Sequence, residues 1–344
     1  MNLIKKILLI IFLNTFGIIL ALFLFEAFYR FAIKKEQITS WTDRPKFYYQ
    51  PENSTNLQSN IYQVPKSDNV YRVAVIGDSF TFATSMQFDD AFPAKIERML
   101  NLNDTSLKAE VINYGVPGYS THHEVETVQK AIAEGADLVL LQITLNDPQL
   151  KNYIPTGITG QNEFGAFQPT PRQAKIFNRW QSLGYVVSRL HNTQTNKNYI
   201  NYFKRLFSQG REFDEFKISL RKIGKACRNS KVKLVAVVFP LYGHRLDDSY
   251  PFFDIHSKVH NILNKNKIPY LDLFESYKYF PLSRIQVEPG IDFHPNEIGH
   301  RIAAEEIYSY LIKEEVLPTE LEIKKIYKKR INILPKNNQP IIDK

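Results

Sequence analysis

The stretch VAVIGDS, residues 73–79, joins a short apolar run to a polar turn that ends in a serine. A β-branched apolar run of this length predicts a fully buried strand of a parallel sheet. Open α/β sheets place their active sites at the carboxyl ends of such strands. Ser79 therefore stands where a nucleophile is expected, although Gly-Asp-Ser tripeptides also occur in ordinary turns.

Three further polar blocks follow along the chain. The block NYGVPGYST, residues 113–121, comes after an apolar pair, and TLND, residues 144–147, comes after the apolar run Leu138–Ile143. The block DFHPN, residues 292–296, lies near the end of the folded part. Because two of these blocks follow predicted strands, as Ser79 does, their polar groups are expected at one edge of a sheet.

Together the four blocks resemble the SGNH (GDSL) hydrolase superfamily, which is named for Ser, Gly, Asn and His. The resemblance covers roughly residues 70–150 and 230–312, and it is closest to membrane-anchored bacterial members. It implies an α/β fold, namely a doubly wound, flavodoxin-like three-layer sandwich with about five parallel strands. The alternation of apolar runs with helical patterns agrees with such a sheet. The expected strands are 72–76, 110–113, 137–144, 233–239 and 270–274.

The resemblance also implies a role for each site residue. Ser79 would attack an ester carbonyl, His294 would take the serine proton, and Asp292 would orient the imidazole. The oxyanion would be bound by the Ser79 backbone N–H, the Gly118 backbone N–H and the Asn146 side chain, because developing negative charge needs preorganised donors. No cofactor and no metal are implied.

Two positions depart from the family pattern. The last block usually reads Asp-x-x-His, whereas here Asp292 is two residues before His294. Three alternatives follow: Asp292 reaches the ring through a different local turn, Glu288 or a backbone carbonyl orients it, or a Ser–His dyad acts alone. Thr144 stands where the family has glycine, two residues before the asparagine.

Each site residue also has an ordinary structural explanation. Ser79 could only cap a helix, His294 could be a loop histidine, and Asn146 could belong to a turn. The joint occurrence of the blocks at strand ends favours a real site.

Gly115 is the alternative to Gly118 as the glycine that binds the oxyanion. His122, His123 and His300 are expected to be structural or surface residues, and Cys227, the single cysteine, excludes an intramolecular disulfide framework.

Several enzyme classes are excluded by missing motifs. The sequence GDSFT, residues 77–81, lacks the second glycine of a Gly-x-Ser-x-Gly elbow, which argues against an α/β-hydrolase. Walker A and Gly-x-Gly-x-x-Gly sequences are absent as well. The net charge is +9, and a basic tail is the only feature in favour of nucleic-acid binding, so we expect no nucleic-acid partner.

An apolar run of 19 residues, 7–25, is long enough to cross a bilayer as a helix. A signal peptide is the alternative, but no A-x-A-like cleavage site follows the run. We expect an uncleaved anchor with a cytoplasmic amino terminus and an outward catalytic domain, periplasmic or at the cell surface. The expected segments are a flank (1–6), the anchor (7–25), a stalk (26–70), the catalytic core (71–147 and 211–313), an insertion (148–210) and a basic tail (314–344).

The insertion is rich in aromatic residues and starts directly after Asn146, so it either caps the site or forms a helical excursion beside the domain.

The expected function is a membrane-anchored esterase acting on acyl groups, acetyl first among them, of an envelope glycan or lipid. One alternative is an O-acyltransferase that works with a membrane-bound O-acyltransferase partner. A second alternative is a non-catalytic glycan-binding module.

Overall fold

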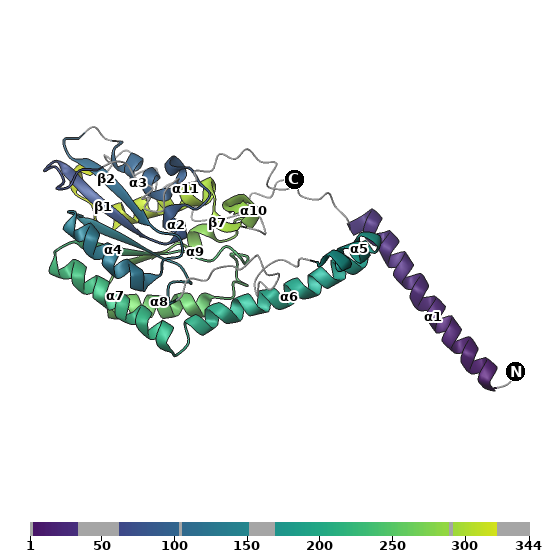
Figure 1. Ribbon diagram of the computed structural model, residues 1–344. Coiled ribbons are helices and arrows are strands. Elements are labelled where there is room, and N and C mark those ends of the chain that lie inside the picture. Colours follow the sequence, from purple (N-terminus) through teal and green to yellow (C-terminus); the bar gives the residue numbers. More distant parts are fainter. Residues whose placement is uncertain (1–2, 34–61, 103–104, 151–168, 289–291, 322–344) are drawn as a thin grey trace. The chain divides into compact units, whose positions relative to one another are not determined.

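The computed structural model describes residues 3–33, 62–102, 105–150, 169–288 and 292–321, and the statements below concern these ranges (Figure 1). The chain divides into two compact units, which are described separately. One comprises Met1–Pro45 and Ile154–Asn201, and the other comprises Lys46–Tyr153 and Tyr202–Lys344. The second unit contains all four polar blocks and therefore holds the candidate site.

The second unit is built on a parallel sheet with the strand order β2-β1-β3-β4-β5. The central residues Val73–Ile76 and Leu138–Leu141 are completely buried, as expected when helices cover both faces. This order is flavodoxin-like and confirms the predicted fold. Each predicted strand matches an observed one to within two residues. The strands are β1 (Val70–Gly77), β2 (Lys108–Gly115), β3 (Leu138–Ile143), β4 (Lys233–Val238) and β5 (Tyr270–Asp272).

Helices lie on both faces of this sheet and complete the three layers (Figure 1). On one face α4 (Thr121–Ala133) packs against α7 (Arg211–Asn229), and on the other α3 (Phe92–Leu100) packs against α11 (Glu297–Lys313). The shorter and outer elements are α2 (Ser79–Phe82), η3 (Phe88–Asp90), α8 (Phe253–Lys265), α9 (Phe274–Tyr277), α10 (Leu282–Ile285) and η4 (Thr319–Leu321).

A small antiparallel hairpin precedes α11. It consists of β6 (Gln286–Glu288) and β7 (Asp292–Pro295). The sequence analysis does not predict this hairpin, because each strand is too short to show an alternating pattern. β7 carries the fourth polar block, so the hairpin decides where Asp292 and His294 lie.

The last residues of the predicted stalk contact the core of the second unit. Tyr62 donates a hydrogen bond to Glu134, and Lys66 forms an ion pair with Asp137. The buried guanidinium of Arg72 donates to the backbone carbonyl of Gln63 at 2.6 Å. The chain is therefore tied to the domain from residue 62 onward. The predicted stalk residues 34–61 lie outside the described residues, as do 151–168 of the insertion and 322–344 of the tail.

The first unit contains α1 (Leu3–Phe28), a π-helical turn (Tyr29–Ile33), α5 (Pro171–Arg179) and the first part of α6 (Gln181–Leu206). The span Lys5–Ala32 is long and apolar enough to cross a membrane. The Glu26 carboxylate accepts hydrogen bonds from the backbone N–H groups of Gln181 and Ser182, at 3.0 and 2.7 Å. This carboxylate thus caps the start of α6, where N–H groups have no partner within the helix.

Candidate active site

The turn after β1 presents Ser79 as the first residue of α2. Asp78 caps this helix, because its Oδ1 accepts a hydrogen bond from the backbone N–H of Phe80 at 2.9 Å. Gly77 leaves no room for a larger residue, since an added Cβ would overlap the side chains of Gln142 and Thr81. The turn therefore holds a half-buried serine at the carboxyl edge of the sheet.

The hairpin brings His294 and Asp292 to this serine. His294 Nε2 lies 2.9 Å from Ser79 Oγ, and His294 Nδ1 lies 2.6 Å from Asp292 Oδ1. Asp292 Oδ1 also accepts the backbone N–H of His294 at 3.0 Å. These separations are within hydrogen-bond range, so the three side chains form one continuous chain.

The geometry of β7 explains why Asp292 still reaches His294, although the two residues are one position closer in sequence than in the family pattern. Residues two apart in a β-strand project from the same face, so Asp292 and His294 of β7 stand side by side. The structure thus matches the first of the three alternatives, in which Asp292 reaches the ring through local backbone geometry. Burial acts to raise the pKa of Asp292, but the hydrogen bond and charge of His294 outweigh it and hold the pKa below its ordinary value.

The side chains of Asn146 and Thr144 both donate hydrogen bonds to the carboxylate of Asp78, the residue before Ser79. Asp78 Oδ2 accepts from Thr144 Oγ1 at 2.8 Å and from Asn146 Nδ2 at 3.0 Å. The Thr144 hydroxyl also contacts Asn146 Oδ1. A primary amide carries two N–H donors, and Asp78 takes one of them. Thr144, which replaces the family's glycine, therefore helps to fix the orientation of Asn146.

Gly118 and Gly115 have different surroundings. Gly115 is buried and pairs in register with Gly77, and an added Cβ would lie 2.7 Å from the Thr81 carbonyl carbon. Gly118 is exposed in the turn after β2 and has a φ of 80°, which favours glycine. A substrate at this edge of the sheet can approach Gly118 but not Gly115, which favours Gly118 of the two.

The three other histidines of the sequence analysis make structural contacts. The ring nitrogens Nδ1 of His122 and His123 lie 2.9 and 3.2 Å from Ser120 Oγ, at the start of α4. His300 is completely buried, and its Nδ1 accepts the backbone N–H of Phe92 at 3.3 Å. Burial lowers the pKa of His300 to about 3, with smaller contributions from the charges of Lys95 and His294.

Sequence reasoning missed a group of buried acids behind the site. Glu124 and Asp147 are buried, the charge of Asp78 acts on both of them, and Glu124 also acts on Asp147. Burial, reinforced by the neighbouring carboxylates, raises the pKa of Glu124 and of Asp147 well above the ordinary values. Asp147 was visible in the TLND block, but nothing in the sequence distinguishes Glu124 from a solvent-facing residue of α4.

Comparisons with known proteins show which family and which solved structures the chain is similar to. The model of the GDSL-like Lipase/Acylhydrolase family matches residues 75–302. A search of curated proteins finds no match. Among solved structures, LAE5, an α/β hydrolase enzyme from the metagenome of Lake Arreo, is 12% identical, with a TM-score of 0.44 over 70% of this chain and 94% of that one.

Two further structures are similar at the same level. A mutant of Axe2, an acetylxylan esterase from Geobacillus stearothermophilus, is 13% identical, with a TM-score of 0.43 over 74% of this chain and 95% of its own. The structure named TesA is 13% identical, with a TM-score of 0.40 over 70% of this chain and 98% of its own.

Proposed function

Because the chain belongs to the GDSL-like lipase/acylhydrolase family, we propose that it is a serine esterase that cleaves acyl esters through an acyl-serine intermediate. The observation that carries this proposal is the continuous contact from Ser79 Oγ through the imidazole of His294 to Asp292, at 2.9 and 2.6 Å. A general base must lie within about 2.6–3.2 Å of the atom whose proton it abstracts, and His294 Nε2, at 2.9 Å from Ser79 Oγ, meets this requirement.

In the first half of the reaction, Ser79 Oγ forms a bond to the ester carbonyl carbon while His294 Nε2 takes the hydroxyl proton. Asp292 holds the other ring nitrogen and stabilises the imidazolium. The carbonyl oxygen becomes an oxyanion, which the backbone N–H groups of Ser79 and Gly118 and the second N–H of Asn146 bind. The tetrahedral intermediate then loses the alcohol, which leaves with the proton from His294.

In the second half, water repeats these steps on the acyl-enzyme. His294 takes a proton from the water, and the resulting hydroxide attacks the acyl carbon. When the new tetrahedral intermediate collapses, the carboxylic acid leaves and Ser79 regains its proton from His294. If a sugar hydroxyl replaces the water, the same residues transfer the acyl group instead, which is the O-acyltransferase alternative with its membrane-bound acyltransferase partner.

We further propose that α1 anchors the esterase in a membrane, with the amino terminus in the cytoplasm and the catalytic domain outside. The support is a single long apolar span at the amino-terminal end. An anchored domain meets substrates at the membrane face, so we propose acyl esters, in particular acetyl esters, of envelope glycans or lipids. Protease digestion of sealed cells and spheroplasts tests the orientation, and protection of the catalytic domain in both would contradict it.

The test of the esterase uses the full chain in detergent with a short-chain aryl acetate. The wild type is expected to turn over, and Ser79→Ala is expected to lose all but a residual activity. Ser208→Ala, which changes an exposed serine bonded to the backbone of α6, is the matched control. Equal rates for the wild type and Ser79→Ala would contradict the proposal.

Hydrolysis and transfer are separated by one further assay. The protein is incubated with an acetylated glycan and a separate unacetylated acceptor, and the products are identified by mass spectrometry. Free acetate alone is the result expected from an esterase. Acetylated acceptor in place of free acetate would establish the transferase alternative, and no product beside bound glycan would indicate the glycan-binding module.

A further inference from the structure

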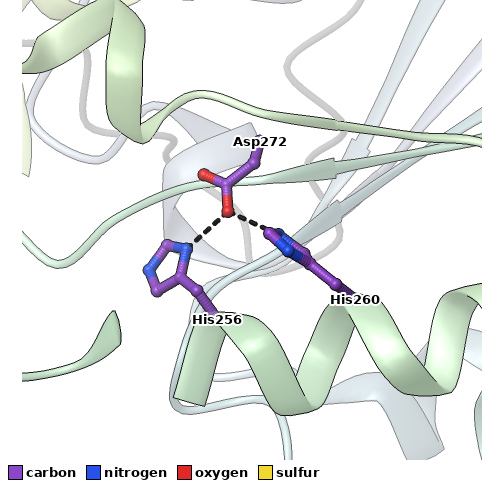
Figure 2. A group of neighbouring side chains, drawn as sticks. All are labelled: His256, His260 and Asp272. Atoms are coloured by element: carbon purple, nitrogen blue, oxygen red, sulfur yellow. Dashed lines mark hydrogen bonds and ion pairs between the residues drawn. The ribbon is translucent and has the colours of Figure 1, made fainter. Parts of the chain in front are cut away.

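Three side chains on α8 and β5 converge on one point outside the serine site. Figure 2 shows the imidazoles of His256 and His260 pointing at the same carboxylate oxygen of Asp272. His256 Nδ1 lies 2.7 Å from Asp272 Oδ2, and His260 Nε2 lies 2.6 Å from it. β5 is three strand spacings from β1, about 14 Å, so this cluster is distinct from the Ser79 site.

The fold brings these donors together in a fixed way. His256 and His260 are four residues apart on α8, so their side chains lie on one face of the helix. Asp272 is the last residue of β5, and its other oxygen, Oδ1, accepts the backbone N–H of Phe274 at 2.9 Å. That bond orients the carboxylate, and a bond of this kind is what holds a metal-binding carboxylate in place.

The exposure of the three side chains to solvent also suits a bound ion. The side chain of His256 is 4% exposed and that of Asp272 is 16% exposed, whereas His260 is 28% exposed. The ring of His260 also stacks on Tyr270, with 4.6 Å between the centroids. The cluster thus has a closed inner side and an outer side from which an ion and a water molecule can enter.

The charge of the cluster is not balanced by a fixed cation. Within the described part of the chain, no lysine or arginine is paired with Asp272. A divalent ion bound between the three donors would supply the opposite charge.

We propose that His256, His260 and Asp272 bind a zinc-class divalent metal ion. Two imidazole nitrogens and one carboxylate oxygen, all within 4.8 Å of one another, form a three-ligand set that zinc takes with a water in the fourth position. Metal–ligand distances of 2.0–2.2 Å place tetrahedral donors about 3.3 Å apart, so small rotations of the two rings admit the ion. The ion would join α8 to the edge strand β5.

No metal is expected from the sequence, because the family resemblance implies none. The relevant pattern is the His-x-x-x-His spacing of residues 256–260, with an aspartate 12 residues further on. This spacing is informative only when the residues lie on a helix and the aspartate lies on the adjacent strand end, which the structure provides.

The test uses the full chain in detergent, first stripped with a chelator and then titrated with Zn²⁺ or Co²⁺. The wild type is expected to bind one ion by calorimetry and to give the visible absorption of four-coordinate Co²⁺. His260→Gln should bind at least about a hundredfold more weakly. Saturating Zn²⁺ should raise the Tm of the wild type, because it binds the folded state, but not that of the variant.

Matched variants separate the metal site from a purely hydrogen-bonded cluster. His260→Gln keeps an N–H that can reach Asp272, so folding is expected to survive and can be checked by circular dichroism. His294→Gln, which changes the histidine of the serine site, and His191→Gln, on α6, should bind Zn²⁺ as the wild type does. No stoichiometric binding by the wild type, or binding that persists in both His260→Gln and Asp272→Asn, would overturn the proposal.

Discussion

At the level of the single residue, Asn146 donates one N–H to Asp78, and we propose that its second N–H binds the substrate oxyanion. We therefore expect Asn146→Ala to lower kcat about a hundredfold with little change in KM, because this donor acts mainly on the oxyanion of the transition state. Steady-state kinetics with an aryl acetate measure both constants. A raised KM with unchanged kcat would instead assign Asn146 to ground-state binding.

Asp292 carries a second prediction at this scale. Asp292→Asn keeps the size of the side chain but removes the charge that opposes the imidazolium, and it can favour the wrong tautomer of His294. We expect kcat to fall by about a thousandfold or more, while the Tm changes little. Activity close to the wild-type value would show that Ser79 and His294 act as a dyad.

Some residues of the site can be predicted from the sequence, and others cannot. Ser79 and Asn146 could be located from their blocks, because each block follows a strand of the parallel sheet. His294 could be located only from the resemblance of its block to the family pattern. The contact of Asp292 with His294 could not be predicted, because a spacing of two residues brings side chains together only if the backbone is extended. That information lies in β7, whose four residues show no strand pattern of their own.

At the level of the element, Asn296 connects the hairpin to α11. Its Oδ1 accepts the backbone N–H groups of Ile298 and Gly299, at 3.0 and 3.1 Å. Its Nδ2 donates to the carbonyls of Arg284 and Gln286, both at 3.0 Å. This side chain therefore caps the helix and fixes the strand that carries His294.

We expect Asn296→Ala to destabilise the fold by about 1–2 kcal/mol and to lower the Tm by about 2 to 8 °C, which differential scanning calorimetry measures. Asn296→Ser keeps an acceptor for the helix cap but loses both Nδ2 donors, so it should give an intermediate Tm. Equal Tm values for the wild type and Asn296→Ala would show that the cap contributes nothing measurable.

The elements of the sheet were predictable for a physical reason. Strands buried on both faces, such as β1 and β3, appear as uninterrupted apolar runs. The hairpin leaves no such pattern, because its two strands are only three and four residues long. The bonds from Asn296 to Arg284 and Gln286 depend on that hairpin and are equally hidden in the sequence.

At the level of the whole molecule, the buried acids make stability depend on pH. The pKa of Glu124 is raised in the folded state, so the folded protein keeps a proton that the unfolded chain releases near pH 4.3. The stabilisation is complete below that pH and is lost as the pH rises toward the folded-state pKa. The Glu124→Gln side chain is neutral at every pH, so the stability of this variant should decline less as the pH rises.

We therefore expect the Tm of Glu124→Gln, relative to the wild type, to rise progressively as the pH increases above the ordinary pKa of a glutamate. Thermal unfolding across this range measures it. Glu126→Gln, which changes a neighbouring acid of α4, is the control and should follow the wild type. A constant difference between Glu124→Gln and the wild type at every pH would show that folding does not shift the pKa of Glu124.

The division into two units is a property of the whole chain that the sequence does not reveal. The aromatic-rich stretch 148–210 was expected to be one insertion, either a cap or a helical excursion, and that question stays a prediction. Its helix α6 ends with Phe203 and Leu206 buried in the second unit, while its first residues belong to the first. The periodicity of the sequence within α6 does not show that the two ends of this helix belong to different units.

Glu26 matters for anyone who trims the chain to obtain a detergent-free fragment. Cutting after residue 35 removes a hydrophobic tether, but it also removes the carboxylate that accepts the first two N–H groups of α6. Those groups would then need water as their acceptor. Fragments without α1 should therefore supply a replacement, for example Trp180→Asp directly before α6, whereas preparations that retain α1 keep the native cap.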